Sequence, residues 1–439
     1  MTQPAPPDPS RRQFFRRFAG EVLTGAAQVA AAVEDLRERS AAEASVLLGD
    51  EVPTAGAVAG ASAAVPGTAI AEGFPRGFRT PFRFDSDDVL LVIDQRRLPD
   101  ALIEIALRGA HDTAAAIREM VVRGAPAIGQ VAAIGLALQA RSARGSKPNT
   151  RRGILAAAAD ALRMARPTAV NLPWAVDRVM ARYTAIGELS EDGEAIAAAM
   201  LDEANAIVAE ATEDHGRMAE AGLAILPMPA GRPVRVLTHC NTGPLAAGQF
   251  GTALGVVQAA HNAERPIHVW VDETRPYLQG ARLTTWELDQ AGVPHTLLPD
   301  MAAGVLMARG EVDAVLVGGD RVAANGDTAN KLGTYTLAVL ADRHRVPFIV
   351  VAPLSSVDLG TPDGSAIAIE ERRAEEVTTI RGVRIAPPGT KAFNPAFDVT
   401  PADLISAIVT EEGALRAPYE ESLGAAMDRR AARRGQAPA

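Results

Sequence analysis

Two residues that could carry catalytic chemistry follow apolar segments of the kind that form buried strands. Cys240, the single cysteine of the 439-residue chain, comes just after the apolar segment 234–238. Asp320 follows the apolar segment 314–317 in the same way. Ligands of open parallel sheets gather beyond the carboxyl ends of the strands. A thiol and a carboxylate at two such ends therefore predict one site.

Cys240 has two interpretations. An isolated cysteine is most often a small buried hydrophobic residue. Here, however, the thiol faces the start of the helix predicted after Gly243. Backbone N–H groups and the helix dipole at such a position favour a thiolate, so we expect a reactive sulfur. His239 need not be its partner, because successive strand residues point to opposite faces.

Asp320 also has two interpretations. A Gly-Asp pair after a strand is commonly a turn or a helix cap. In this chain the carboxylate lies between an apolar strand and the polar loop 325–331. Desolvation at that position would raise its pKa and let Asp320 carry a proton near neutral pH.

The segment 123–129 has the composition of an anion-binding loop. Arg123 supplies a guanidinium fork, Gly124 allows close backbone approach, and Ala125 opens a helix whose first N–H groups are free. An ordinary helix-start turn is the alternative. Further donors suited to hydroxyls or phosphate come from segments that would singly pass for solvated loops: Arg166 in 166–172, Gln279 before Gly280, Asn330 and Lys331.

The elements that must position these residues alternate in the second half of the chain. Helical patterns dominate from Asp112 to about Ile225, after a strand at 88–94. The predicted fold class is α/β, with a small, mostly helical N-terminal domain followed by a Rossmann-like domain built on a parallel sheet. The turn after the first strand of that sheet lacks the G-x-G-x-x-G pattern, so no dinucleotide cofactor is predicted. The predicted strands are 235–238, 267–271, 295–298, 314–317 and 348–351, and the predicted helices are 246–260, 284–291, 302–309 and 331–344.

Composition and the positions of Gly and Pro residues divide the chain into four predicted segments. Residues 1–80 form an N-terminal extension, with a basic helical stretch at 14–48 and a Gly/Ala/Pro-rich linker at 52–73. The predicted domains are 81–229, helical, and 230–420, Rossmann-like, followed by a C-terminal tail at 421–439.

Composition excludes several classes of function. A net charge of −9 without a basic stripe disfavours nucleic-acid binding. One cysteine makes no internal disulfide, and no Cys/His cluster has zinc spacing, so we predict no metal. No apolar run reaches membrane-spanning length. The segment from Ser10 through Arg11 and Arg12 resembles a twin-arginine export signal, but Glu21 interrupts the apolar run and no cleavage motif follows, so we predict a cytoplasmic protein. An amphipathic basic helix that binds a partner or a membrane surface is the alternative reading of this segment.

A collinear set of motifs is similar to the methylthioribose-1-phosphate isomerase family of methionine salvage. Its superfamily also holds the regulatory subunits of the eukaryotic initiation-factor exchange complex. The resemblance covers about 87–408. It is carried by the segments 122–129, 166–172, 239–243, 272–276, 279–284, 319–322, 330–335, 381–383 and 394–401.

The resemblance implies an isomerase without a cofactor that acts on a small sugar phosphate, usually as a homodimer. It assigns the proton donor to Asp320 and transition-state stabilisation to Cys240. The first 80 residues depart from the family pattern. By resemblance, the substrate contacts are Arg123, Gly124, Ala125, Arg166, Gln279, Asn330 and Lys331.

Two alternatives remain open at the level of sequence. A sister isomerase of 5-deoxyribose 1-phosphate or ribose 1,5-bisphosphate would share the phosphate grip and the acid. A non-catalytic regulatory subunit would bind a sugar phosphate or a translation factor, and the presence of both Cys240 and Asp320 argues against it.

Overall fold

A small antiparallel sheet and a bundle of helices form the first part of the described chain. A computed structural model describes residues 80–85, 89–166 and 169–435. The three strands pair in the order β1-β2-β3. Their bounds are β1 Phe82–Phe84, β2 Leu90–Ile93 and β3 Glu104–Leu107, followed by α2 Ala110–Arg118, α3 Ala125–Ser142, α4 Pro148–Arg163, α5 Asn171–Ile186 and α6 Gly193–Ile225.

Helix α3 is the central helix of this bundle. Nearly all of its residues are buried, including those on the sides that face α5 and α6. Small residues permit this: a Cβ on Gly129 would lie 2.7 Å from the backbone oxygen of Asn171. A helix that is apolar all round belongs in a core, so its first turn is held rigidly by the surrounding helices.

A seven-stranded sheet forms the second part, in the order β16-β15-β10-β7-β4-β5-β6. All neighbouring pairs are parallel except β15 with the edge strand β16. The predicted fold class is confirmed, and each of the five predicted strands is present. The bounds are β4 Val234–Thr238, β5 Ile267–Asp272, β6 His295–Leu298, β7 Ala314–Val317, β10 Phe348–Val351, β15 Ala407–Thr410 and β16 Gly413–Leu415.

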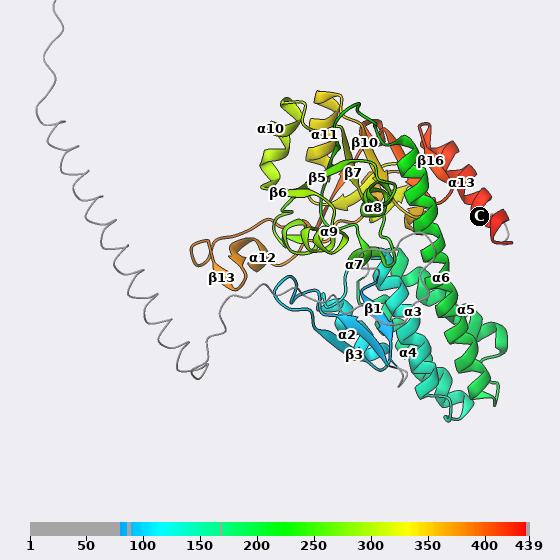
Figure 1. Cartoon of the computed structure of the whole chain (residues 1–439). Coiled ribbons are helices and arrows are strands. Elements are labelled where there is room, and N and C mark those ends of the chain that lie inside the picture. Colours follow the sequence, from blue (N-terminus) through cyan, green and yellow to red (C-terminus); the bar gives the residue numbers. More distant parts are fainter. Residues whose placement is uncertain (1–79, 86–88, 167–168, 436–439) are drawn as a thin grey trace, which may run out of the picture. The chain divides into compact units, whose positions relative to one another are not determined.

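Helices cover both faces of this sheet (Figure 1). On one face Val315 and Phe348 share a core with residues of α10, α11 and α13. On the other face Val236 and Leu316 pack with residues of α6 and α8. These helices are α8 Ala253–Asn262, α9 Thr285–Ala291, α10 Ala303–Ala308, α11 Thr334–His344 and α13 Tyr419–Arg433, with short 3-10 turns at η2 Asp300–Ala302, η3 Leu354–Ser356, η4 Gly364–Ala366 and η5 Ala402–Leu404.

The predicted helix 246–260 is wrong in its first part. The chain forms the short helix α7, Pro244–Ala247, and then a loop before α8 begins. Gly248 and Gly251 both have positive φ in this loop. A Cβ on Gly251 would lie 2.5 Å from Cα of Gly243, so the loop folds back onto the start of α7.

The predicted loop 325–331 and the start of the predicted helix 331–344 are also corrected. Residues Thr328–Lys331 form strand β9, and helix α11 starts only at Thr334. Strand β9 belongs to a second sheet, in the order β11-β8-β9-β14, and pairs antiparallel with both its neighbours, β8 and β14. The other bounds are β8 Arg321–Ala323, β11 Val357–Asp358 and β14 Phe397–Thr400.

A projecting arm leaves the body of the protein near residue 375 (Figure 1). It contains helix α12, Glu375–Thr378, and the strand pair β12, Thr379–Ile380, with β13, Val383–Arg384. Phe393 on the return from this arm is 80% exposed.

The described residues belong to one compact unit, 67–439. Helix α6 packs on α8, so the helical part and the sheet share a core, and a division at 229 and 230 stays a prediction. Part of the predicted tail, 421–433, belongs to α13. The predicted basic helix at 14–48 and linker at 52–73 lie outside the described residues.

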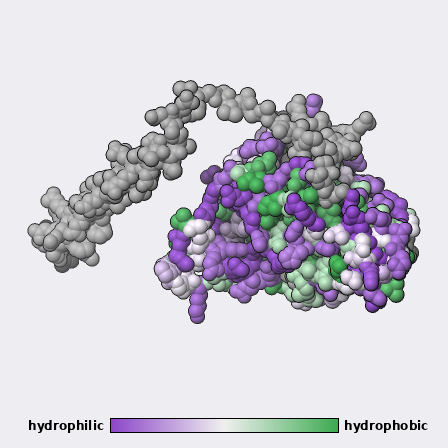
Figure 2. Space-filling model, turned by 90° about the horizontal axis from the view of Figure 1, so that it is seen from below, coloured by the Kyte–Doolittle hydropathy of each residue, from purple (hydrophilic) through white to green (hydrophobic). Residues whose placement is uncertain are grey.

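The face seen from below in Figure 1 carries mostly hydrophilic side chains, with hydrophobic ones gathered in patches (Figure 2). Within residues 80–435, no described helix combines the length and the apolar character needed to cross a bilayer.

Candidate active site

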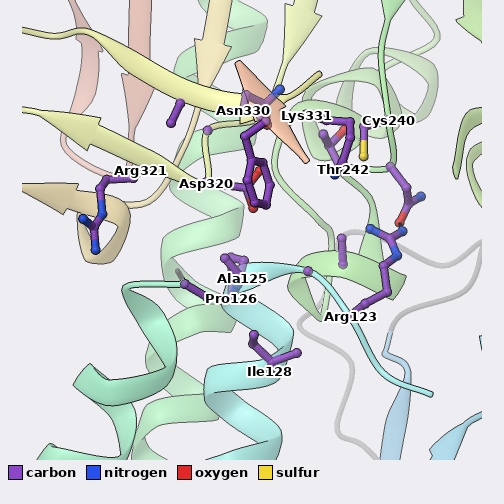
Figure 3. A pocket seen from close by; sticks show the side chains of 18 of the residues that line it. Arg123, Ala125, Pro126, Ile128, Cys240, Thr242, Asp320, Arg321, Asn330 and Lys331 are labelled. Atoms are coloured by element: carbon purple, nitrogen blue, oxygen red, sulfur yellow. Dashed lines mark hydrogen bonds between the residues drawn. The ribbon is translucent and has the colours of Figure 1, made fainter. Parts of the chain in front are cut away.

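The strand ends of β4 and β7 bring Cys240 and Asp320 to the same edge of the sheet. The two strands are parallel neighbours, with Thr238 opposite Leu316. Cys240 and Asp320 therefore both follow the carboxyl ends of adjacent strands, as predicted from the apolar segments. They line one pocket of about 990 Å³, counting its part open to solvent (Figure 3).

The backbone of Cys240 is held in an unusual conformation. Its φ is 64°, a region that residues other than glycine rarely adopt. Its N–H donates to Oγ1 of Thr274 at 2.8 Å, and its carbonyl accepts from Oγ1 of Thr284 at 2.6 Å. Two side chains from the segment after β5 thus fix the direction of the thiol, a pattern typical of functional positions.

The opposite wall of the pocket is the start of helix α3. Gly124 has φ 101°, and a Cβ there would lie 2.2 Å from the backbone oxygen of Ala246. No side chain caps this helix, so N–H groups of its first turn are available to a ligand. Arg123, buried beside them, directs its guanidinium toward Asn241, which accepts a hydrogen bond from Nη2. Such a helix start is a ready site for an anion.

The remaining predicted contacts surround the same space. Lys331 donates from Nζ to the carbonyl of Ala396 at 2.7 Å and lies 4.4 Å above the ring of Phe397. Arg166 lies 4.0 Å from Glu370. All nine predicted site residues line the pocket: Arg123, Gly124, Ala125, Arg166, Cys240, Gln279, Asp320, Asn330 and Lys331.

The electrostatics of the pocket agree with one expectation and overturn another. Desolvation raises the pKa of Asp320, against the lowering effect of Lys331 and then of the arginines, as expected for a proton carrier. Burial also raises the pKa of Cys240, and the nearby cations of Arg123 and Lys331 only offset part of that effect. The predicted preference for a thiolate is therefore wrong: burial favours the thiol form of Cys240.

His239 does not face Cys240 across the pocket. Its Nδ1 lies 3.1 Å from Oδ2 of Asp272, and its Nε2 lies 2.8 Å from the carbonyl of Leu332. Both ring nitrogens of His239 thus have partners other than Cys240, in agreement with the expectation that His239 need not be the partner of the thiol.

One group in the described part of the chain has the spacing of a metal site: His239, Asp272 and Asp300, with ligand atoms within 4.8 Å of one another. Most of their atoms already have partners, although Oδ1 of Asp272 is buried without a hydrogen-bond partner within the described residues. Both ring nitrogens of His239 are engaged, and the Asp300 carboxylate accepts from the N–H groups of Thr274 and Arg275. A metal ion would have to replace these hydrogen bonds.

Several pocket residues escaped sequence reasoning. Asn241 lies within a recognised motif but was assigned no role. Arg372 and the apolar residues near it come from a segment without a regular pattern, so no periodic signal could have found them. The additional lining residues include Met120, Asn241, Ile367, Ala368, Ile369, Arg372 and Phe397.

All nine predicted site residues lie in the part of the chain that is similar to known proteins. The sequence pattern of the family described as "Initiation factor 2 subunit family" matches residues 121–417. The chain is 52% identical over 351 residues to a methylthioribose-1-phosphate isomerase of an Anaeromyxobacter species, which covers 80% of this chain and 98% of that protein. The chain belongs to the initiation factor 2 subunit family. Within the family, its most similar curated relatives also include the methylthioribose-1-phosphate isomerase of Pelotomaculum thermopropionicum, at 50% identity over 78% of this chain and 92% of that protein.

Two solved structures of this family share the fold. The crystal structure of 5-methylthioribose 1-phosphate isomerase from Pyrococcus horikoshii is 40% identical, with a TM-score of 0.73, over 80% of this chain and 96% of that chain. A structure from A. fulgidus titled translation initiation factor eIF-2B, subunit delta, is 38% identical, with a TM-score of 0.70, over 80% of this chain and 99% of that chain.

Proposed function

We propose that this chain converts 5-methylthio-α-D-ribose 1-phosphate into 5-methylthio-D-ribulose 1-phosphate, an aldose–ketose isomerisation in methionine salvage. The observation that carries the proposal is the joint lining of one pocket by Cys240, Asp320 and an uncapped helix start. The chain is also 52% and 50% identical in sequence to two methylthioribose-1-phosphate isomerases, which supports the same reaction. We further propose a cytoplasmic homodimer.

The phosphate group would bind at the start of α3. Arg123, Arg166 and Lys331 bring cations to the pocket, and the first turn of α3 adds N–H donors. Guanidinium groups and helix N-termini are the groups that bind phosphate most readily in proteins. Gln279 and Asn330 would then bind sugar hydroxyls, since the buried Oε1 of Gln279 has no partner within the described residues.

Asp320 would act as the acid that opens the sugar ring. The phosphate on the anomeric oxygen blocks opening through a free hemiacetal, so the C1–ring oxygen bond itself must break. A protonated Asp320 gives its proton to the ring oxygen, which becomes the C4 hydroxyl. The raised pKa of Asp320, caused by desolvation, supplies that proton near neutral pH. The resulting carboxylate takes the proton of the C2 hydroxyl when the ketone forms, which restores the acid.

Hydrogen must also move from C2 to C1. A hydride route transfers it with both electrons of the C2–H bond, whereas a proton route needs a base at Cys240. Burial raises the pKa of that thiol, which disfavours a thiolate base at Cys240. We therefore favour the hydride route, with Cys240 shaping an apolar environment around the cationic carbon. Complete retention of deuterium from C2 of the substrate at C1 of the product is expected, and exchange with solvent would support the proton route.

The 5-substituent would lie against apolar side chains. Ile128, Ile367 and Phe397 line the pocket together with its polar groups. An apolar wall suits a methylthio or a methyl group better than the second phosphate of ribose 1,5-bisphosphate. A single apolar group changes discrimination by only about 1 to 3 kcal/mol, so 5-deoxyribose 1-phosphate remains an alternative substrate. Initial rates of the purified chain on the three sugar phosphates would rank them.

A regulatory role is the second candidate, and the A. fulgidus structure titled as an initiation-factor subunit is the observation that favours it. Turnover decides between the two. Wild-type protein should isomerise methylthioribose 1-phosphate, and Cys240→Ser and Asp320→Asn should each lower kcat by roughly 10²-fold or more. Wild-type protein that binds the sugar phosphate without turning it over would support the regulatory role, and activity that survives both substitutions would remove the catalytic pair.

A further inference from the structure

We infer that Glu287, a carboxylate buried behind the pocket, is a positioning residue that sets the orientation of Arg123 through the side chain of Asn241. The inference rests on the proposed function, in which Arg123 binds the phosphate of the substrate. Glu287 itself does not line the pocket, so it would act only through its neighbours.

A chain of hydrogen bonds joins the three residues. Nη2 of Arg123 donates to Oδ1 of Asn241, and Nδ2 of Asn241 donates to Oε2 of Glu287. The other carboxylate oxygen, Oε1, accepts from the N–H of Leu245 at 2.6 Å. Each of the three side chains is at most 5% exposed. Within the described residues, the buried Nε of Arg123 has no hydrogen-bond partner.

The direction of each bond fixes the amide of Asn241. Its oxygen must face Arg123, because a guanidinium has only donors, and its nitrogen must then face an acceptor. Glu287 is the residue type that meets this need while also accepting from Leu245, because an ionised carboxylate has two accepting oxygens. The hydroxyl of Thr284 adds a weaker constraint, since it accepts from the same Nδ2 at 3.2 Å and donates to the carbonyl of Cys240 at 2.6 Å.

The carboxylate of Glu287 packs directly against the backbone of Gly243. A Cβ on Gly243 would lie 2.2 Å from Oε2 of Glu287, so this carboxylate fills the space over the Gly243 backbone. A buried carboxylate is costly unless its oxygens are hydrogen-bonded. Both oxygens of Glu287 are hydrogen-bonded here, one of them to the amide that also contacts Arg123 and Thr284.

Replacement by glutamine tests the pattern of donors and acceptors at nearly constant shape. In Glu287→Gln, the new amide can accept from Leu245 or from Asn241, but not from both. If the new amide oxygen accepts from the N–H of Leu245, its nitrogen faces Asn241, and Asn241 must turn its own oxygen toward that nitrogen. The amide nitrogen of Asn241 then faces the guanidinium of Arg123, so that two donors meet. The guanidinium would then lose its fixed direction. A second substitution, Asn241→Asp, restores an acceptor for each donor, and it keeps the total charge of the cluster.

The experiment measures KM, kcat and, by calorimetry, Kd for methylthioribose 1-phosphate at about pH 8.5, where the Glu287 carboxylate is ionised. Loss of a charge-assisted hydrogen bond in the phosphate arm should raise KM and Kd of Glu287→Gln by roughly 10- to 100-fold. The arm binds the ground state and the transition state alike, so kcat should change by less than about threefold. The double variant Asn241→Asp, Glu287→Gln should return KM and Kd to within about threefold of wild type.

Two controls separate positioning from general damage. Glu411→Gln changes another buried carboxylate that accepts from a backbone N–H, that of Leu354 at 2.9 Å. Glu411 does not line the pocket and is not bonded to Arg123 or Asn241, so this variant should leave KM unchanged. In an Asn241→Ala background the chain is already broken, so Glu287→Gln should raise KM no further. This background also provides the test if Glu287→Gln alone fails to fold.

Three results would overturn the inference. These are unchanged KM and Kd in Glu287→Gln, a fall in kcat as large as the rise in KM, and no recovery of KM and Kd in the double variant. Wild-type protein that binds without turnover would reject the proposed function, and the Kd values would still test the inference. Wild-type protein that neither binds nor turns over the sugar phosphate would overturn both.

Discussion

His239 and Asp272 form a buried hydrogen-bonded pair beside the residue that bears the thiol. The Nε2 atom of His239 faces a carbonyl, that of Leu332, so this nitrogen must carry a hydrogen. The Nδ1 atom lies 3.1 Å from Asp272, and this contact also needs a hydrogen. Burial alone lowers the pKa of His239, but the hydrogen bond and charge of Asp272 outweigh it and raise that pKa. Desolvation raises the pKa of Asp272 to about 6.

This pair predicts a stability that falls as pH rises. Both groups have a pKa that is higher in the folded than in the unfolded protein, so folding takes up protons and stability is greatest at low pH within this range. The contribution should be lost between about pH 4 and the raised pKa of His239. Asp272→Asn leaves Asn to donate to a neutral His239, so the pKa of His239 should fall and the slope of unfolding free energy against pH should flatten. Titration of His239 by NMR and urea unfolding at several pH values measure both, and an unchanged His239 titration would contradict the influence of Asp272 on His239.

Asp320 predicts the basic limb of the pH–rate profile. As an acid it must be protonated, so kcat is full below its pKa and falls as pH rises through it. Lys331 is the strongest of the cations that lower this pKa. Lys331→Met should therefore move the falling limb of kcat to higher pH at saturating substrate, while KM rises because a phosphate contact is lost. The residual activity of Asp320→Asn should show no such limb, and a limb that stays in place in Lys331→Met would contradict the assignment.

Gly124 predicts a large effect from one added methyl group. Its φ of 101° disfavours any other residue by about 1 kcal/mol, and a Cβ would also meet the backbone oxygen of Ala246 at 2.2 Å. Gly124→Ala should lower the unfolding free energy by about 2 to 4 kcal/mol and displace the phosphate-binding turn. Gly187 is the control, because its φ of 103° is similar but open space surrounds it. Gly187→Ala should therefore lower the unfolding free energy by only about 1 kcal/mol, the effect of the backbone conformation alone. Equal costs at the two positions, measured by urea unfolding, would show that the close approach to Ala246 has no effect.

Glu287 predicts a difference in stability that depends on pH. Desolvation raises its pKa from 4.5 to about 7, against the lowering effect of the Leu245 N–H, Asn241 and Arg123. Between pH 4.5 and about 7, Glu287 is ionised in the unfolded chain but still protonated in the folded protein. The wild-type protein therefore loses stability as pH rises through this range. Glu287→Gln does not titrate, and the unfolding free energy of wild type relative to this variant should fall by roughly 3 kcal/mol from pH 4.5 to 7. A constant difference across this range would show that the carboxylate is ionised at low cost.

The sheet and the gathering of the site were predictable because both depend on local patterns. Each core strand is a short apolar segment between Gly, Pro or polar residues, and the strands 314–317 and 348–351 were predicted to the residue. Parallel strands share one carboxyl edge, so Cys240 and Asp320 had to lie near each other once β4 and β7 were adjacent.

The parts that were not predictable depend on contacts between distant segments. The helical pattern 246–260 breaks where Gly248 and Gly251 adopt positive φ and Gly251 packs on Gly243, a contact that the apolar pattern does not reveal. Strand β9 carries polar residues and forms only because β8 and β14 flank it. The thiol pKa follows from burial of Cys240, which outweighs the local effect of a helix start.

The pocket draws its lining from residues as far apart as Met120 and Phe397, on a helix start, the ends of sheet strands and a second small sheet. A bound sugar phosphate would therefore tie together pieces that meet only when the described chain is completely folded. Such a ligand acts as a thermodynamic clamp: its binding free energy is added to the unfolding free energy of the whole assembly of elements. The enzyme should accordingly resist proteolysis and heat best in cells where its substrate is abundant.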